Sequence, residues 1–274
     1  MLSIIITHHR TPVLLKLCLK SIKENIGQFE HEIIVVDSQA EPVNQDLIKE
    51  KFPSIRFISF SKNLGYAKIV NKGIESSQGE YLLILNADII VLKESINRLL
   101  EFIKGHPRVG IVAPQLLTFT NEVQSSCFRH PDFWGFMGFI AARRTFLGKL
   151  TWGKRKINQF LIKEEDFSSS KAVDWVQGSA ILVRKQAIEK VGLLDEKFFM
   201  YLEDADWCRR FQQNGYQVFY LPFAQMAHYY YRSSKKWGGF LDILLNRYTR
   251  LHLISAFKYF WKWRGSEVQG TPLK

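Results

Sequence analysis

The chain has 274 residues, a length that suits one large α/β unit or two small domains. Apolar residues make up 46% and charged residues 23% of the sequence, which excludes a disordered tail or a fibre. The net charge of +12 concentrates in two aromatic-rich segments: residues 129–165 carry eight Lys or Arg against three Asp or Glu, and residues 229–274 carry nine against two.

Short β-branched runs alternate with helical patterns up to about residue 120. Strands are predicted at Leu2–Thr7, Glu32–Asp37, Ile55–Phe60, Tyr81–Leu85 and Val109–Pro114. Helices are predicted at Pro12–Asn25, Val43–Lys51, Tyr66–Ser77 and Lys93–Gly105. This alternation indicates a mainly parallel sheet flanked by helices, with ligands beyond the carboxyl ends of its strands.

The second half is less regular. Residues 121–170 show no clear period and are interpreted as a variable connection with loose helices. The elements predicted after it are a strand pair within Ala172–Arg184, a short helix at Gln186–Val191, a helix at Glu203–Asn214, a strand at Tyr216–Leu221 and a long helix at Gly239–Trp263.

The three cysteines, Cys18, Cys127 and Cys208, are too few and too widely spaced for a disulfide framework, which favours a reducing compartment. The first ten residues have neither a basic region nor a cleavage site, so a signal peptide is not expected. The sequence also lacks an 18-residue apolar stretch of the kind that spans a membrane.

The turn after the first strand contains no glycine, so a glycine-rich phosphate-binding loop is excluded there. A divalent cation held by carboxylates is the common substitute for such a loop. Asn86-Ala87-Asp88 follows the apolar strand at the carboxyl edge of the sheet, where Asp88 could hold Mg²⁺ or Mn²⁺ against a diphosphate. The alternative is an ordinary turn in which Asp88 caps the next segment.

Glu203-Asp204-Ala205-Asp206 is the densest carboxylate cluster in the sequence. Carboxylates in a first helical turn complement the helix dipole, so a purely structural role is one alternative. Crowded like charges and partial burial would instead raise the pKa of one carboxyl and make it a better general base.

Four motifs in order carry a resemblance to a known family. They are Asn63-Leu64-Gly65-Tyr66-Ala67 with Asn71 and Gly73, Leu85-Asn86-Ala87-Asp88, Trp175-x-x-Gly178-x-Ala180, and the run from Gly192 to Arg210 that includes Asp195-Glu196 and Glu203-Asp204-x-Asp206. Residues 2 to about 230 thereby resemble the family 2 glycosyltransferases of the GT-A fold, with the nearest likeness to a rhamnosyltransferase-like branch.

The resemblance implies a role for each matching residue. The nucleotide-sugar would contact Thr7, Arg10, Asp37, Asn63, Gly65, Asn71, Asn86 and Asp88, and the acceptor would contact Trp175, Gly178 and Asp206. Asp88 and His228 would bind Mg²⁺ or Mn²⁺, while Asp204 would be the catalytic base with Glu203 in reserve. The chain departs from the family's usual pattern at His8-His9, at Val36-Asp37-Ser38-Gln39-Ala40 and at Ala87.

The resemblance further implies a GT-A catalytic domain over residues 1–228, with a nucleotide-sugar half at 1–120 and an acceptor half at 121–228 that contains the variable segment 129–165. Residues 229–274 would form a basic, aromatic helical tail. The implied activity is inverting, metal-dependent transfer of a sugar to a glycan or lipid-linked acceptor in bacterial surface polysaccharide synthesis. The alternative is a catalytically silent glycan- or nucleotide-binding module.

In the predicted helix Gly239–Trp263, four basic residues fall within a third of the circumference, at Arg247, Arg250, Lys258 and Lys262. Basic residues beside aromatic ones favour binding to an anionic membrane surface, here the cytoplasmic face of the cell membrane. The alternatives are a helix packed on the catalytic domain or within a homodimer. Nucleic-acid binding ranks last because no recognition motif accompanies the charge.

Overall fold

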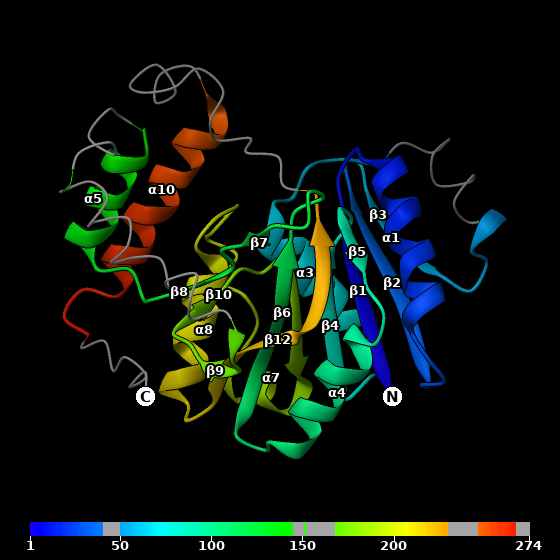
Figure 1. Ribbon diagram of the computed structural model, residues 1–274. Coiled ribbons are helices and arrows are strands. Elements are labelled where there is room, and N and C mark those ends of the chain that lie inside the picture. The colour runs from blue at the N-terminus through cyan, green and yellow to red at the C-terminus, as the bar shows by residue number, and fades with distance from the viewer. Residues whose placement is uncertain (41–49, 145–150, 152–167, 230–245, 267–274) are drawn as a thin grey trace.

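The computed structural model describes residues 1–40, 50–144, 151, 168–229 and 246–266 (Figure 1). Its strands are β1 Leu2–His8, β2 His31–Ser38, β3 Arg56–Phe60, β4 Tyr81–Asn86, β5 Ile89–Val91, β6 Val109–Leu117, β7 Val123–Gln124, β8 Cys127–Phe128, β9 Lys171–Ala172, β10 Trp175–Val176, β11 Ala180–Arg184 and β12 Gln217–His228. Its helices are α1 Pro12–Asn25, α3 Tyr66–Ser76, α4 Ser95–Gly105, α5 Phe133–Arg144, α7 Lys185–Val191, α8 Glu203–Gln213 and α10 Arg247–Lys262.

The main sheet has the strand order β3-β2-β1-β4-β11-β6-β12-β5. Strands β3, β2, β1 and β4 are parallel, and β12 is parallel to β6. The five strands and three of the four helices predicted in the first half are confirmed, whereas most of the predicted helix Val43–Lys51 lies outside the described residues. The prediction of a mainly parallel sheet flanked by helices is therefore confirmed.

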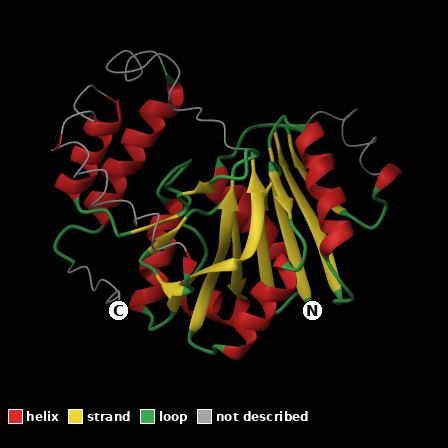
Figure 2. Ribbon diagram, viewed as in Figure 1, coloured by secondary structure: helices red, strands yellow, loops and turns green. Residues whose placement is uncertain are grey.

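Alternating side chains bury the two faces of the sheet in separate cores. Ile4 and Ile6 pack with α1 and α4 on one face, while Ile5 packs with α3, α7 and α8 on the other. Figure 2 shows helices covering both faces of the strands. Near-continuous apolar strands are required by this arrangement, because each strand must supply side chains to both cores.

The predicted strand pair within Ala172–Arg184 is wrong. β11 lies between β4 and β6 and is antiparallel to both, whereas β9 pairs with β12 and β10 pairs with β8. Apolar alternation identifies a strand but does not reveal its neighbours. The insertion of β11 places the turn before it beside the end of β4, where Asn86 N donates to Ser179 O at 2.8 Å.

The strand predicted at Tyr216–Leu221 continues to His228. Its register with β6 shifts between Leu221 and Gln225, a stretch that contains Pro222, and the strand then also pairs with β5. Proline has no backbone N–H to donate within a sheet, so Pro222 is typical of the end of a strand. In the structure the strand continues past Pro222 with a shift in register. This extension sets His228 opposite Ile89 and therefore next to Asp88.

The two helices α5 and α10 lie side by side next to α8 (Figure 1). Phe260 of α10 packs against Phe133 and Phe136 of α5, with ring centroids 5.3 and 5.5 Å apart. Within the described ranges, no helix combines the length and apolar character needed to cross a membrane. The cysteines Cys18, Cys127 and Cys208 are free and buried.

Candidate active site

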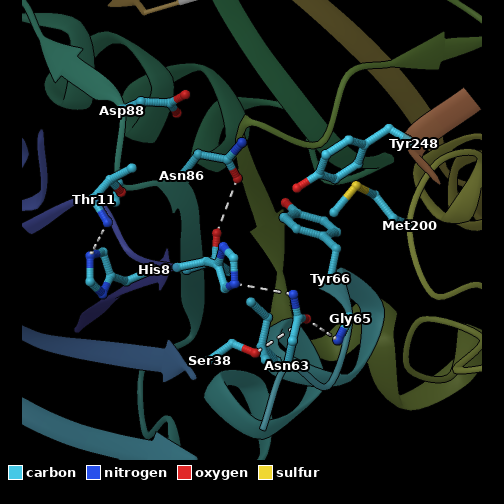
Figure 3. Close-up of a pocket in the computed structure, with 14 residues that line it drawn as sticks. His8, Thr11, Ser38, Asn63, Gly65, Tyr66, Asn86, Asp88, Met200 and Tyr248 are labelled. Atoms are coloured by element: carbon cyan, nitrogen blue, oxygen red, sulfur yellow. Dashed lines mark hydrogen bonds between the residues drawn. The ribbon is translucent and has the colours of Figure 1, made fainter. Parts of the chain in front are cut away.

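A pocket of about 210 Å³ opens at the carboxyl ends of β1, β2 and β4. It is lined by Thr7, His8, His9, Thr11, Ser38, Asn63, Gly65, Tyr66, Ile69, Asn86, Ala87, Asp88, Met200 and Tyr248 (Figure 3). Of the residues predicted to contact a nucleotide-sugar, the structure brings Thr7, Asn63, Gly65, Asn86 and Asp88 together here. Arg10, Asp37 and Asn71 do not line this pocket.

His8 occupies the position that Asp37 was expected to take. Asp37 Oδ1 lies 2.9 Å from His8 Nδ1, and both side chains are only 4% exposed. The backbone N–H of Thr11 donates to His8 Nε2 at 3.0 Å, so the imidazole carries its proton on Nδ1, toward Asp37. Asp37 thus orients His8, and His8 presents its ring to the pocket.

Asn63 organises the turn that enters α3. Its Oδ1 accepts a hydrogen bond from Gly65 N at 3.0 Å, and its Nδ2 lies 3.2 Å from His9 Nε2. Gly65 has a φ of +83°, and a Cβ there would lie 2.5 Å from Phe199 O, so no larger residue fits without a shift. This turn holds the pocket wall close to the segment before α8.

Asn71, which was expected to contact the nucleotide, lies within α3 and does not line the pocket. Its Nδ2 donates to Leu194 O at 2.9 Å, and its Oδ1 accepts from Leu194 N at 3.0 Å. Its side chain is therefore used to anchor the loop after α7. Arg10, which is exposed and has a φ of +55°, does not reach the pocket either.

Asp88 and His228 form a pair at the edge of the pocket. His228 Nε2 lies 3.6 Å from Asp88 Oδ1, and His228 Nδ1 lies 2.9 Å from Gln124 Oε1. Because the Gln124 amide nitrogen donates to Gln177, its oxygen faces His228 and fixes the imidazole proton on Nδ1. The unprotonated Nε2 consequently faces Asp88.

This donor set fits a divalent cation. Asp88 Oδ1 is buried and accepts no hydrogen bond from the described residues, and a neutral imidazole nitrogen points toward it. A glutamine oxygen behind the imidazole orients the histidine as a metal ligand requires. Among the described residues no group of three or more His, Cys, Asp or Glu could hold a metal ion, so two protein ligands would need others from a bound substrate.

Two consecutive non-glycine residues, Tyr201 and Leu202, adopt left-handed backbone conformations with φ of 75° and 64° immediately before α8. Such conformations cost about 1–3 kcal/mol each and are typical of functional sites. They set Glu203 and Asp204 at the first turn of α8. The sequence offered no signal for this turn, because neither residue is a glycine.

Asp204 is held by hydrogen bonds from three directions. Gly178 N donates to Oδ2 at 2.9 Å, Ala205 N donates to Oδ1 at 2.8 Å, and the Trp175 side chain also bonds to the carboxyl. Burial raises the pKa of Asp204, while these hydrogen bonds oppose the shift. Trp175 and Gly178 were expected to bind the acceptor, but both contact Asp204 and neither lines the pocket.

Tyr66 connects the pocket to this carboxylate cluster. Its ring lines the pocket, and its hydroxyl donates to Gly178 O. The backbone N–H of Gly178 in turn donates to Asp204. Burial raises the pKa of Tyr66 well above its usual value, and the charges of Glu203, Asp204 and Asp88 add to the shift. Tyr66 thus links the pocket to Asp204 through Gly178.

Glu203 differs from its neighbour in its partners. It is 5% exposed, and its Oε2 has no hydrogen-bond partner among the described residues. Burial, and next the charge of Asp204, raise the pKa of Glu203 well above the usual carboxyl value. Glu203 therefore lacks the hydrogen-bond donors that hold Asp204.

Asp206 does not bind an acceptor as expected, because its carboxylate is completely buried between α8 and α10. Its Oδ2 lies 2.9 Å from Arg210 Nε, and its Oδ1 lies 2.8 Å from Lys262 Nζ and 3.0 Å from Trp263 Nε1. These contacts make Asp206 the link between the helix of the carboxylate cluster and the C-terminal helix.

Replacing Asp206 with asparagine should lower the free energy of unfolding by about 2–4 kcal/mol, because two cations lose a buried partner. Asp195→Asn is the matched control, since Asp195 also binds Lys262, at 2.7 Å, but its side chain is 21% exposed. Its loss should be about 1 kcal/mol or less. Urea denaturation of the two variants measures the difference, and equal losses would contradict the structural role of Asp206.

The comparisons with known proteins agree with this geometry. The family profile described as Glycosyl transferase family 2 matches residues 3–191. An N-acetylglucosaminyl-diphospho-decaprenol L-rhamnosyltransferase of Mycobacterium tuberculosis strain H37Rv is 26% identical over 208 residues, covering 72% of this chain and 66% of that protein. The chain thus spans just under two thirds of the mycobacterial protein. Rhamnosyltransferase WbbL of Escherichia coli K12 is 27% identical over 250 residues, covering 88% of this chain and 87% of that protein.

Two solved structures share the fold. GalNAc-T7 with UDP, GalNAc and Mn²⁺ superposes with a TM-score of 0.64 at 15% identity, covering 84% of this chain and 43% of that chain. The mannosyltransferase PcManGT from Pyrobaculum calidifontis, in complex with GDP-Man and Mn²⁺, gives 0.60 at 16% identity and covers 99% of this chain and 66% of that chain. The chain has the GT-A fold and belongs to glycosyltransferase family 2.

Proposed function

We propose that the chain is an inverting, metal-dependent glycosyltransferase. The observation that carries this proposal is the arrangement around Tyr66. The Asp88–His228 pair borders the pocket that Tyr66 lines. The Tyr66 hydroxyl donates to Gly178 O, and Gly178 N donates to Asp204. A transferase of this kind needs one group to bind the departing diphosphate and a separate carboxylate to accept a proton. The Asp88–His228 pair would supply the first and Asp204 the second.

The residues divide into three roles. His8, Ser38 and Asn63 form the polar wall for the base and ribose of a nucleotide-sugar. Asp88 and His228 would hold Mg²⁺ or Mn²⁺, which when bound neutralises the charge of the diphosphate. Asp204 accepts the proton of the acceptor hydroxyl as that oxygen attacks the anomeric carbon, and the bond to the nucleoside diphosphate breaks with inversion.

The donor is proposed from the names of the relatives. Two of them are rhamnosyltransferases by name, so dTDP-rhamnose is the first candidate and a UDP-hexose the second. The acceptor would be a glycan or lipid-linked intermediate of a bacterial surface polysaccharide, as the name of the mycobacterial relative supports. A thermal-shift screen of dTDP-, UDP- and GDP-sugars with Mn²⁺ tests this ranking, since a bound ligand stabilises the fold. A shift with GDP-mannose alone would contradict it.

The alternative function is a silent module that binds a glycan or nucleotide without reacting. Turnover of the donor separates the two functions. The purified protein with Mg²⁺ or Mn²⁺ should release nucleoside diphosphate from at least one donor in the panel. Binding of a donor without hydrolysis or transfer of any would support the silent module instead.

Peripheral attachment to the cytoplasmic face of the cell membrane is also proposed, but with different contacts from those expected. Lys258 binds Lys197 O at 2.6 Å and Lys262 binds Asp195 and Asp206, so these lysines serve to dock α10 on the protein. Large apolar side chains of α5 and α10 are exposed instead. We call them the aromatic surface: Phe133, Trp134, Met137, Ile254, Phe257 and Trp261.

Membrane attachment should depend on the aromatic surface. The triple variant Trp134→Ala, Phe257→Ala and Trp261→Ala should sediment with anionic vesicles about tenfold less than the unchanged protein, because interfacial aromatic insertion is lost. Val13→Ala with Leu17→Ala is the control, since both side chains are exposed on α1. If the triple variant sedimented with the vesicles as well as the unchanged protein does, membrane attachment through the aromatic surface would be contradicted. The aromatic surface would then be assigned to contact with a second copy of the chain.

A further inference from the structure

The C-terminal helix contributes a residue to the candidate donor pocket. Tyr248, near the start of α10, lines the pocket together with Tyr66 and Met200. In Figure 3 the side chains of Tyr248 and Tyr66 both point into the pocket, on the side where Met200 also lies. The sequence had placed residues 229–274 in a separate tail, but α10 forms part of the same site.

The position of Tyr248 is fixed by contacts on both sides of it. Asn246 caps the helix by accepting a hydrogen bond from Tyr248 N at 2.9 Å. Further along α10, Ser255 Oγ donates to Met200 O at 2.8 Å, and the His252 ring stacks on Tyr201 at 4.7 Å. Helix α10 thus binds the strained turn that leads into the carboxylate cluster.

The pocket has walls of two kinds. The polar part of the lining includes His8, Ser38 and Asn63, and Figure 3 shows Tyr66, Tyr248 and Met200 on the other side of the pocket. Tyr248 is 37% exposed, so part of its ring remains open to a ligand. Ligand pockets commonly combine such an apolar wall with a few polar groups that fix orientation.

The location of the apolar wall indicates which part of the donor it meets. If the diphosphate binds at Asp88 and the acceptor proton goes to Asp204, the sugar must lie between these carboxylates. Tyr66 links these two places, since its ring lines the same pocket as Asp88 and its hydroxyl donates to Gly178 O, while Gly178 N donates to Asp204. Tyr248 lines the same pocket as Tyr66, and a pyranose ring presents C–H groups that pack on an aromatic face.

We propose that Tyr248 packs against the sugar ring of the donor, which makes α10 an integral part of the catalytic unit. This inference rests on the proposed function. It assigns the sugar, and not the nucleotide, to the wall that the C-terminal helix completes. The ring of Tyr248 supplies the contact, whereas its hydroxyl is not needed for it.

The test compares binding of a nucleoside diphosphate with binding of the matching nucleotide-sugar by isothermal titration calorimetry. The probes are dTDP, dTDP-rhamnose, UDP and UDP-glucose, each with Mn²⁺. Tyr248→Ala should weaken binding of the preferred nucleotide-sugar at least fivefold and leave binding of its nucleoside diphosphate within twofold. Tyr248→Phe should bind both within twofold of the unchanged protein. The retained nucleotide affinity shows that the Tyr248→Ala variant is folded.

Phe257→Ala is the matched control, because Phe257 is on the same helix but 67% exposed on the opposite, aromatic surface. It should change neither affinity. Equal weakening of nucleotide and nucleotide-sugar in Tyr248→Ala, or no weakening of either, would overturn the role of Tyr248. Failure of the unchanged protein to bind any probe would instead count against the proposed function, so the two failures are distinguishable.

Discussion

Replacing Asp204 with asparagine should reduce kcat by about 10²–10⁴-fold, the usual contribution of a general base. The amide keeps the size of the side chain, but its single oxygen can accept only one of the hydrogen bonds that Gly178 N and Ala205 N donate to the two carboxylate oxygens. Because Asp204 does not line the donor pocket, the affinity for the nucleotide-sugar should still stay within about twofold. Initial rates at saturating donor, together with donor titrations, measure the two effects separately. Weakened donor binding with unchanged turnover at saturation would show that Asp204 holds the donor and is not the base.

Glu203→Gln is the comparison for this variant. Glu203 is buried and its Oε2 accepts no hydrogen bond from the described residues, whereas Asp204 is held by several donors, so replacement of Glu203 should have a much smaller effect on kcat. A larger loss for Glu203→Gln than for Asp204→Asn would assign the base to Glu203. Burial also raises the pKa of Asp204, and a base must be deprotonated to act. As the pH is lowered, the rate should therefore begin to fall at a higher pH than an ordinary carboxyl would give.

Removing the Asp88 carboxylate should abolish the dependence of donor binding on the metal. In Asp88→Ala, the affinity for a nucleotide-sugar in Mn²⁺ should drop to the value that the unchanged protein shows in EDTA, because the ligand beside His228 Nε2 is lost. Calorimetric titrations with and without EDTA measure this. Glu101→Ala, which removes an exposed carboxylate on α4, should leave the metal dependence intact.

A smaller loss of metal affinity is expected for Gln124, which contacts His228 and not the proposed metal site itself. Gln124→Ala removes the oxygen that orients His228, and loss of such a partner costs about 10–100-fold in metal affinity. If Asp88→Ala retained full Mn²⁺ dependence, the Asp88–His228 pair would not be the metal site.

The five strands predicted before residue 120 are confirmed, because a sheet covered on both faces needs near-continuous apolar runs. The same logic placed Asn86 and Asp88 correctly, since strand ends at one edge of a parallel sheet converge. His228 was proposed from a family resemblance. The structure adds the reason: β12 passes the irregularity at Pro222 and pairs with β5 beside Asp88.

Long-range side-chain partners could not be predicted in this way. Asp37 and Asp206 have the residue type and setting of ligand-binding carboxylates, but a histidine lies against one and two cations bind the other. Tyr248 was missed for a related reason. Helical periodicity shows that α10 has an apolar face. It does not show that one end of the helix reaches a pocket whose other lining residues are distant in the sequence.

The stereochemistry of transfer tests the central claim most directly. Proton NMR can follow the sugar released from the turned-over donor, with water or an added acceptor, in the unchanged protein and in Asp204→Asn. A single displacement assisted by Asp204 predicts that the first product formed has the anomeric configuration opposite to that of the donor, and that the variant forms almost none of it. A first product with the donor's configuration, or equal product from both proteins, would contradict the account.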